Sequence, residues 1–221
     1  MVGSGYLAPV QASAWKVLLA KYGLELGDDL VIETNPVGRL FGVGPEVPIV
    51  QQYDSHPITR DLGGIMTAFP LSRSIGIART PPQGVVAQSL AKTSTGSWAE
   101  TNRDEVKRGQ LRMDDKDVKG PVTVAAVATK DKARLVVFGT AALAANNGLG
   151  FQGNRDFFLN TVSWLAEEED QISIRAKDVK KTPVFLSAQQ AQAVFLLPVV
   201  VLPALVLTGG IVAVVRRRAS K

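Results

Sequence analysis

Residues 122–139, VTVAAVATKDKARLVVFG, decide the fold of this chain. The apolar run 122–129 is followed by the connection 130–133, with three charged side chains in four positions, and then by a second apolar run, 134–139. Apolar runs rich in β-branched residues on either side of a short charged connection are typical of neighbouring strands. Both runs are long and apolar, so we expect them to lie at the centre of a sheet.

Four further stretches have the composition of strands. Residues 69–77 and 85–92 are apolar and are separated by the turn sequence Pro-Pro-Gln-Gly at 81–84. Residues 30–32 form a shorter β-branched run that we expect to be buried, and residues 171–175 form another short strand.

Three other stretches are rich in Gly and Pro, polar or highly charged. Residues 35–48 are rich in Gly and Pro and are interpreted as a loop. Residues 94–102 are polar, although they include Trp98. The charged stretch 103–119 carries three aspartates near its end, but the spacing and terminal glutamate of an EF-hand calcium loop are missing. We interpret those aspartates as part of a solvated turn.

Near the amino end, one segment has the periodicity of an amphipathic helix. Trp15, Leu18, Leu19 and Tyr22 follow the spacing of a single helical face, and Gly23 is suited to end the helix. Side chains at this spacing usually pack in a core. We therefore assign the whole face, Trp15 included, to the core.

A second helix is predicted to begin near Asn154. Asn154 is suited to the N-cap and Asp156 to the first turn. The apolar face would consist of Phe157, Phe158, Val162 and Leu165. Helices interspersed with strands predict an α/β fold, a sheet with flanking helices, in a domain of residues 1–175.

Charge and cysteine content exclude several functions. The chain has 25 basic and 20 acidic residues, a net charge of +5. Without the four basic residues of the tail 216–221, 21 basic residues face 20 acidic ones, which argues against a surface that binds nucleic acid. The absence of cysteine excludes disulfides, thiolate metal sites and a cysteine nucleophile.

An uncharged apolar run of 23 residues, 193–215, is followed directly by Arg216, Arg217 and Arg218. A helix of this length measures about 34 Å, enough to cross a hydrocarbon core of about 30 Å. Positive charge beside a span favours the cytoplasmic side. We expect a transmembrane helix, with the tail 216–221 inside, the domain outside and residues 176–192 as a polar connection. The alternative, a buried core helix, rarely lacks every charge.

The amino terminus conflicts with this orientation. The first residues, MVGSGYLAPVQ, have neither the basic region nor the apolar region of a signal peptide. A chain that began at Met1 would be tail-anchored with its domain on the cytoplasmic side. Either the charge rule fails here or an upstream segment precedes Met1, and we favour the second.

Two sequence features, one suggesting catalysis and one suggesting dinucleotide binding, lack the other residues that these functions need. His56 is the only histidine, and no nucleophile signature such as Gly-x-Ser-x-Gly accompanies it. Pro57 favours extended geometry at His56, so we interpret His56 as a loop residue that starts a turn into a helix at Thr59. The pattern G-x-G-x-x-G at 148–153 lacks the adjoining strand and the acidic residue of a dinucleotide site.

Several short motifs follow one another along the chain. They are YDSHPIT at 53–59, STGSWAE at 94–100, VVFG at 136–139, GNRDFFLN at 153–160 with WL at 164–165, and ISIR at 172–175 ahead of the terminal apolar run. Their order and spacing resemble the Gldg family. These are the auxiliary, so-called substrate-binding components of ABC-2 type transport systems, named from gliding motility. The resemblance covers almost the whole chain and the carboxyl half of a longer member.

The resemblance implies an extracytoplasmic α/β domain, similar to class I glutamine amidotransferase-like domains and incomplete here, tethered beside a permease. Members often have an acidic stretch after the Phe-Gly at 138–139, where this chain has Thr140, Ala141 and Ala142. An amidotransferase also needs a cysteine nucleophile, which this chain lacks. The resemblance therefore implies a non-catalytic fold.

The expected function is that of a non-catalytic, membrane-anchored auxiliary or substrate-binding subunit of an ABC-2 type system in the bacterial cytoplasmic membrane. Its partners would be the permease and ATPase of that system and the lipid bilayer, with no nucleic acid and no cofactor, since no Walker motif is present. Candidate partner or ligand contacts are Tyr53, His56, Arg60, Trp98, Asn154 and Arg155. Two alternatives stay open, an anchored hydrolase with His56 as base and a carbohydrate or lipid receptor independent of any transporter.

Overall fold

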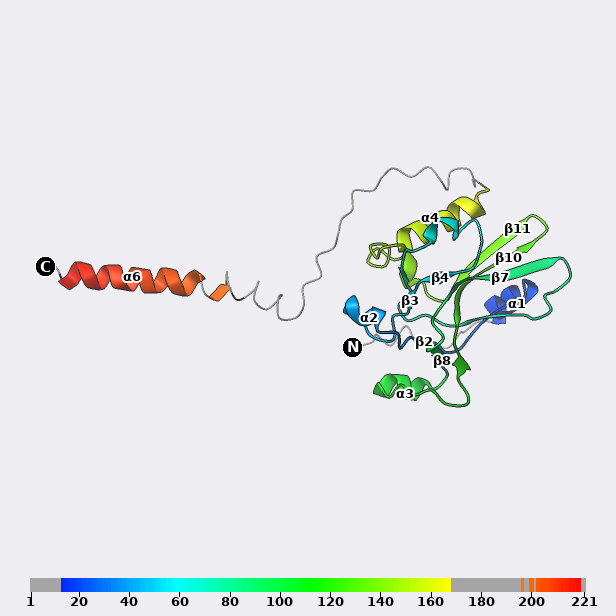
Figure 1. Ribbon diagram of the computed structural model, residues 1–221, viewed down its shortest axis with the longest axis horizontal. Helices are drawn as coiled ribbons and strands as arrows, with labels where there is room; N and C mark the ends of the chain where they lie inside the picture. The colour runs from blue at the N-terminus through cyan, green and yellow to red at the C-terminus, as the bar shows by residue number, and fades with distance from the viewer. Residues whose placement is uncertain (1–12, 168–195, 197–198, 201, 220–221) are drawn as a thin grey trace. The chain divides into compact units, whose positions relative to one another are not determined.

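The computed structural model describes residues 13–167, 196, 199–200 and 202–219 (Figure 1). The chain divides into two compact units, Met1–Ala176 and Lys177–Lys221, which we take one at a time. The first unit holds every strand that the structure describes. It is a mixed α/β structure, made mostly of sheets with a few helices, which confirms the predicted fold class at this level.

The central sheet has four strands in the order β11-β10-β7-β4. Its members are β4 (Gln52–Tyr53), β7 (Val85–Lys92), β10 (Thr123–Lys130) and β11 (Ala133–Phe138). β10 and β11 form an antiparallel hairpin from Ala125 opposite Phe138 to Lys130 opposite Ala133. The predicted pair of strands in residues 122–139 is therefore confirmed, and so is the strand at 85–92.

Three smaller sheets complete the first unit, and all their ladders are antiparallel. One has the order β2-β8-β9, and the other two are the pairs β1-β6 and β3-β5. Their strands are β1 (Leu24–Leu26), β2 (Leu30–Ile32), β3 (Ile49–Val50), β5 (Thr67–Ala68), β6 (Ile75–Ile77), β8 (Trp98–Glu100) and β9 (Val118–Lys119). The predicted strand at 30–32 is confirmed, whereas the one at 171–175 lies outside the described residues.

Short helices connect and cover these sheets. They are α1 (Ser13–Lys21), α2 (Val37–Leu40), α3 (Arg103–Arg108) and α4 (Asn154–Leu165), with the 3-10 turns η1 (Arg60–Leu62) and η2 (Ala142–Ala144). Figure 1 shows α4 and α1 at different sides of the central sheet. Two separate apolar clusters follow from this arrangement.

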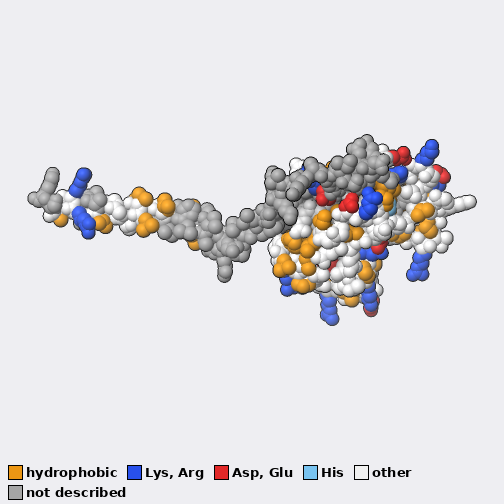
Figure 2. Space-filling view, turned by 45° about the horizontal axis from the view of Figure 1, so that its top comes forward, with side chains coloured by type: hydrophobic (Ala, Val, Ile, Leu, Met, Phe, Trp, Pro, Cys, Tyr) orange, Lys and Arg blue, Asp and Glu red, His pale blue; other side chains and the backbone are white. Residues whose placement is uncertain are grey.

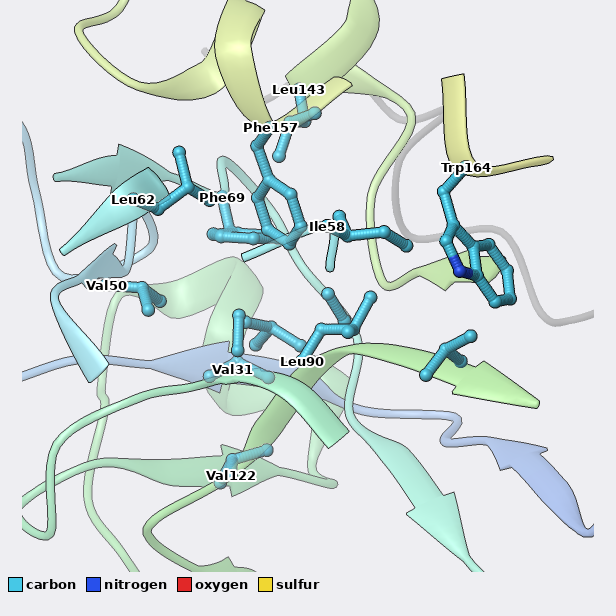
Figure 3. Close-up of a cluster of buried hydrophobic side chains, with 14 of the residues drawn as sticks. Val31, Val50, Ile58, Leu62, Phe69, Leu90, Val122, Leu143, Phe157 and Trp164 are labelled. Carbon is cyan, nitrogen blue, oxygen red and sulfur yellow. The ribbon is translucent and has the colours of Figure 1, made fainter. Parts of the chain in front are cut away.

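The larger cluster lies between the central sheet and α4. Phe157 of α4 is fully buried in it, with its ring 5.3 Å from that of Phe138 and 6.2 Å from that of Phe69. Figure 3 shows Phe157 pointing from α4 into the cluster, with Leu62 to one side and Ile58 to the other. The second cluster joins Leu19 of α1 and residues of β1 and β6 to Ala126 and Ala128 of β10.

The predicted core face of the first helix is wrong in part. Leu19 is buried, but Trp15 is 62% exposed and Leu18 38% exposed. α1 has only nine residues, and Leu19 near its end and Tyr22 just after it reach the second cluster. Helical spacing correctly predicts the helix, but Trp15 and Leu18 do not belong to the core of the described residues.

Two other predictions need correction. The predicted strand 69–77 contains only β6, because Pro70 has no N–H for a ladder and Leu71 adopts a φ of 52°, which breaks the strand. The polar stretch 94–102 contains a buried strand, β8, which lies between β2 and β9. In addition, the predicted loop 35–48 contains the one-turn helix α2.

The glycines of the pattern at 148–153 serve close packing. A Cβ at Gly148 would collide with the carbonyl oxygen of Ala142, and one at Gly153 would lie 2.6 Å from Cγ2 of Ile65. At Gly150 the nearest atom would be the carbonyl oxygen of Asn147 at 3.6 Å, an ordinary contact. Steric requirements thus account for the first and last glycine of the pattern.

The second unit contains α6 (Leu202–Ala219), with Arg216, Arg217 and Arg218 exposed in its last turn. Among the residues that the structure describes, none of the helices combines the length and the apolar character that membrane crossing requires. Residues 193–195, 197–198 and 201 of the predicted span 193–215 lie outside the described part of the chain. The predicted connection 176–192 lies wholly outside it.

We predict that Gly148→Ala lowers the free energy of unfolding by about 1–3 kcal/mol, because the added methyl group overpacks a tight backbone contact. Gly150→Ala, two residues along the same loop, should change it by less than about 0.5 kcal/mol. Urea unfolding of the two variants measures the difference. Equal effects would contradict the steric explanation.

Candidate functional site

The pocket that we take as the candidate site opens along residues 51–63, the His56 loop, and has a volume of about 590 Å³. The loop begins in β4, which pairs with β7 at the edge of the central sheet, and ends in the turn η1. The residues lining the pocket are Gln51, Tyr53, Asp54, Ser55, His56, Pro57, Thr59, Arg60 and Gly63.

Asp54 attaches the loop to β7. Its N–H donates to the carbonyl of Leu90 at 3.0 Å. Its carboxylate accepts a hydrogen bond from the Ser89 hydroxyl and forms a 2.8 Å ion pair with the Lys92 ammonium. Both charged side chains are partly exposed, so the ion pair contributes at most about 1 kcal/mol. The charges of Asp54 and Lys92 nevertheless neutralise each other at this wall.

The His56 imidazole is held in one orientation. Its Nδ1 accepts a hydrogen bond from the Ile58 N–H at 3.2 Å, so in the neutral ring the proton resides on Nε2. The ring meets Trp164 of α4 edge to face, with centroids 4.9 Å apart. The His56 carbonyl accepts from the Thr59 N–H at 2.9 Å, which confirms the predicted turn ahead of Thr59.

Tyr53 forms the buried base of the pocket. Its hydroxyl lies 2.9 Å from the Ile65 carbonyl, 2.9 Å from the Thr67 hydroxyl and 3.1 Å from the Val50 carbonyl. Burial raises the pKa of Tyr53 to about 12, while the hydrogen bonds with Thr67 act in the opposite direction. A phenol with this pKa stays protonated near neutral pH. Tyr53 therefore stabilises the loop and cannot act as a base there.

Arg60 brings a positive charge to the mouth of the pocket. It is exposed in η1, and no hydrogen bond or ion pair joins it to another described residue. The guanidinium of Arg60 is a donor with a fixed positive charge. Arg60 therefore offers the pocket a contact suited to an anionic or hydrogen-bond-accepting group.

The structure gathers only three of the predicted contact residues, Tyr53, His56 and Arg60, in one pocket. Trp98 is buried in β8, where its indole N–H donates to the Glu100 carboxylate at 3.2 Å. It belongs to a different apolar cluster. Arg155 is exposed in the first turn of α4. Arg216, Arg217 and Arg218 belong to the second unit.

Asn154 is not the N-cap that its type predicts. Gly153 holds that position without a side-chain bond, and Asn154 is fully buried. Its amide accepts from the Ala68 N–H at 2.8 Å and donates to the carbonyls of Ala68 and Gly148, each at 3.0 Å. The side chain thus joins β5 to the loop ahead of α4, so it acts within the fold and not as a surface contact.

Sequence reasoning missed three residues beside the pocket: Ser89, Lys92 and Trp164. Ser89 and Lys92 reach it because β4 pairs with β7, with Gln52 opposite Lys92. Trp164 reaches His56 because α4 packs across the sheet. These contacts depend on strand register and on packing. The only signal in the sequence was that Ser89 and Lys92 are polar residues within the predicted apolar strand 85–92.

Catalytic groups are sparse around this pocket. Within the described part of the chain, His, Asp and Glu side chains form no group of three able to hold a metal ion. Nδ1 of His56 already accepts a hydrogen bond. On the face that Figure 2 shows, Lys and Arg side chains project singly around the first unit.

Comparison with known proteins finds similarity to solved structures alone. No protein-family model matches the chain, and no curated protein matches it. Among solved structures, the chain is similar to one described as "mmIFT52 N-terminal domain", with 14% sequence identity and a TM-score of 0.48. The match covers 68% of this chain and 56% of the other, so the chain spans little more than half of that structure's length.

We predict that Asn154→Ala lowers the free energy of unfolding by about 2–4 kcal/mol, because it leaves buried backbone groups without hydrogen-bond partners. Asn146→Ala, an exposed position in the preceding loop, serves as the control. Urea unfolding checks both variants. A loss equal to that of the control would show that the three amide bonds do not stabilise the domain.

A second prediction concerns Tyr53 and pH. Its folded pKa of about 12 exceeds the usual tyrosine pKa of 10.0, so its contribution to stability is complete below pH 10 and is lost as pH rises through 12. We expect the free energy of unfolding to fall by about 2–3 kcal/mol over this interval from Tyr53 alone. Tyr53→Phe should remove that part of the pH dependence in urea titrations. Identical slopes in both proteins would refute the assignment.

Proposed function

We propose that this chain is a non-catalytic, membrane-anchored auxiliary subunit of an ABC-2 type transport system. In this proposal the first unit lies outside the bacterial cytoplasmic membrane, residues 193–215 cross it and residues 216–221 lie inside. The first unit would bind a ligand or hold a partner, while another chain hydrolyses ATP.

The single observation that carries the proposal is the uncharged apolar run 193–215 followed by Arg216, Arg217 and Arg218. Burial of such a run in hydrocarbon is favourable, whereas three adjacent arginines are costly to transfer and therefore favour one side. The nearly neutral domain ahead of this run supports the same division of the chain. α6 brings the arginines to its last turn, where cations also interact favourably with the helix dipole.

The pocket geometry supports a binding role over catalysis. Nδ1 of His56 accepts a backbone hydrogen bond, Tyr53 has its pKa raised to about 12 and Asp54 is paired with Lys92. His56 Nδ1, the Tyr53 hydroxyl and the Asp54 carboxylate thus each have a partner within the first unit. The guanidinium of Arg60 leaves donors for a partner or ligand.

The transport system itself rests on the resemblance of the motifs to the Gldg family. Permease and ATPase subunits are the expected partners, together with the bilayer. The amidotransferase-like architecture of that family stays a prediction. The described strands of the central sheet pair antiparallel, which distinguishes this sheet from the parallel sheet of many α/β folds.

We predict that the full chain, expressed in bacteria, stays in the membrane pellet after alkaline carbonate washing. A variant that ends at residue 192 should be released, because it lacks the apolar run. Quantitative immunoblotting of pellet and supernatant measures the distribution. Release of the full chain would refute the proposed anchor.

A further test addresses the partner. An ABC-2 type permease and ATPase from the source organism should be expressed with the full chain, and they should copurify with it in mild detergent. Arg60→Ala should reduce their recovery about tenfold if Arg60 makes a charge-assisted contact. Arg79→Ala, another exposed arginine of the first unit, is the control. Failure of both subunits to copurify with the unaltered chain would contradict the proposal.

A further inference from the structure

β11 is the last strand on one side of the central sheet, and its outer edge has no partner among the described residues. The Gly139 N–H donates to the Val124 carbonyl at 2.9 Å, and hydrogen-bonded and non-hydrogen-bonded pairs alternate along an antiparallel ladder. Val136 and Phe138 therefore direct their N–H and C=O groups away from β10. No described residue forms a backbone hydrogen bond with these groups.

α4 runs back along β11 and ends beside the start of that strand. Near the amino end of α4, the ring of Phe157 lies 5.3 Å from that of Phe138, the last residue of β11. Near its carboxyl end, the Trp164 carbonyl accepts a hydrogen bond from the Arg134 guanidinium, which also lies over the Trp164 ring. The Glu167 carboxylate is 3.9 Å from Nε of Arg134. The chain therefore leaves α4 at the level where β11 begins.

The sequence after α4 has the composition of a short loop and a strand. Three acidic residues, 168–170, precede the stretch QISIR at 171–175. Connections of about 2–6 residues are usual between a helix and the next strand of an α/β unit. Ile172 and Ile174 alternate with polar side chains, which is typical of a strand with one buried face. The first unit extends to Ala176, so this stretch belongs to the same unit as β11.

Stereochemistry places the free edge of β11 on the side that a right-handed crossover requires. Seen from α4 with β11 running upwards, an L-residue whose side chain faces the viewer directs its own N–H and C=O to the right. Val136 and Phe138 pack against the cluster beneath α4, so the free edge lies to the right of β11. A connection from a strand through a helix to a parallel strand is right-handed in about 98% of cases. With the helix in front, the second strand then lies to the right of the first.

α4 also carries an apolar flank on this side. The Asn160 side chain donates to the Ile58 carbonyl at 2.9 Å, which directs one flank of the helix to the His56 loop. That loop begins in β4, at the opposite edge of the sheet from β11. At about 100° per residue, Val162 and Leu165 lie on the other flank, where they are 46% and 41% exposed. A strand beside β11 with apolar side chains towards α4 would cover this flank.

We propose that residues 171–175 form a further strand of the central sheet, parallel to β11 on its free edge. β11, α4 and this strand would then form a right-handed strand–helix–strand unit, with Ile172 and Ile174 facing α4. The Ser173 N–H would donate to the Val136 carbonyl, and the Ser173 carbonyl would accept from the Phe138 N–H. This inference does not depend on the proposed transport function.

Cysteine cross-linking tests the pairing, because the chain has no cysteine of its own. In the proposed strand Ser173 would lie beside Val137, with Cα atoms about 4.8 Å apart, within the range of a disulfide. Val137→Cys combined with Ser173→Cys in the full, detergent-solubilised chain should form a disulfide within one chain under mild oxidation. Non-reducing electrophoresis and mass spectrometry detect it.

Val86→Cys combined with Ser173→Cys is the matched control. Val86 is 66% exposed on β7, three strand spacings or about 14 Å from the proposed strand, so this pair should stay reduced. The proposal fails if the pair at 137 and 173 stays reduced, if it links two chains and not one, or if the control pair links equally.

Hydrogen exchange followed by NMR tests the backbone bonds separately. The Phe138 amide should exchange slowly in the unaltered chain and in Ser173→Ala, which keeps the N–H of residue 173. Ser173→Pro removes that N–H, so exchange at Phe138 should become about tenfold faster or more. The Val137 amide, which bonds to β10, reports in each variant whether the sheet itself is folded.

Each remaining outcome of the exchange experiment overturns the proposal. Fast exchange at Phe138 beside a protected Val137 in the unaltered chain would show that the edge is open. Slow exchange at Phe138 that Ser173→Pro leaves unchanged would show that something else covers the edge, such as a second copy or another protein. If the Val137 amide also exchanges fast in Ser173→Pro, that variant is unfolded and the cross-linking result decides.

Discussion

Burial of β10 on both faces is the constraint on which the rest of the structure depends. Val124, Ala125, Ala126 and Ala128 are fully buried. Val124, Ala125 and Val127 belong to the cluster beneath α4, whereas Ala126 and Ala128 belong to the cluster beneath α1. The register against β7 shifts on either side of Ala125, which explains how Val124 and Ala125 enter the same cluster. A strand enclosed in this way needs neighbours on both edges and a layer on each face.

The same constraint explains which parts of the fold were predictable. A strand covered on both faces appears in the sequence as an unbroken apolar run, so β10 within residues 122–139 was correctly identified. The strand at 85–92 was identified from its apolar content, although Val86 in it is 66% exposed. Residues 98–100 form a buried strand that polar neighbours concealed, and its buried Glu100 is satisfied by the Trp98 indole and the Asn102 N–H. Trp15 shows the converse error, because periodicity reports a helical face but not whether a layer lies opposite.

Within the candidate site, local chemistry was predictable and distant contacts were not. Pro57 and Thr59 correctly indicated the turn that holds His56. The ion pair of Asp54 with Lys92 depends on the register of β4 with β7. The packing of His56 on Trp164 joins residues far apart in the sequence, and Arg134 lies over the same indole, 4.7 Å from its centroid. The residues that line the pocket therefore come from the local loop, whereas the contacts behind them depend on tertiary packing.

The contact of His56 with Trp164 and the bonds of Asn154 with Ala68 also bear on the timing of folding during synthesis. Asn154 and Ala68 are separated by 86 residues, and closing a flexible loop of that length costs about 4 kcal/mol in chain entropy. Both contacts depend on α4, which is the last described helix of the first unit. A nascent chain that has released β4 and the His56 loop from the ribosome therefore still lacks the indole on which the His56 ring packs. The His56 ring gains this contact only when α4 has emerged and docked.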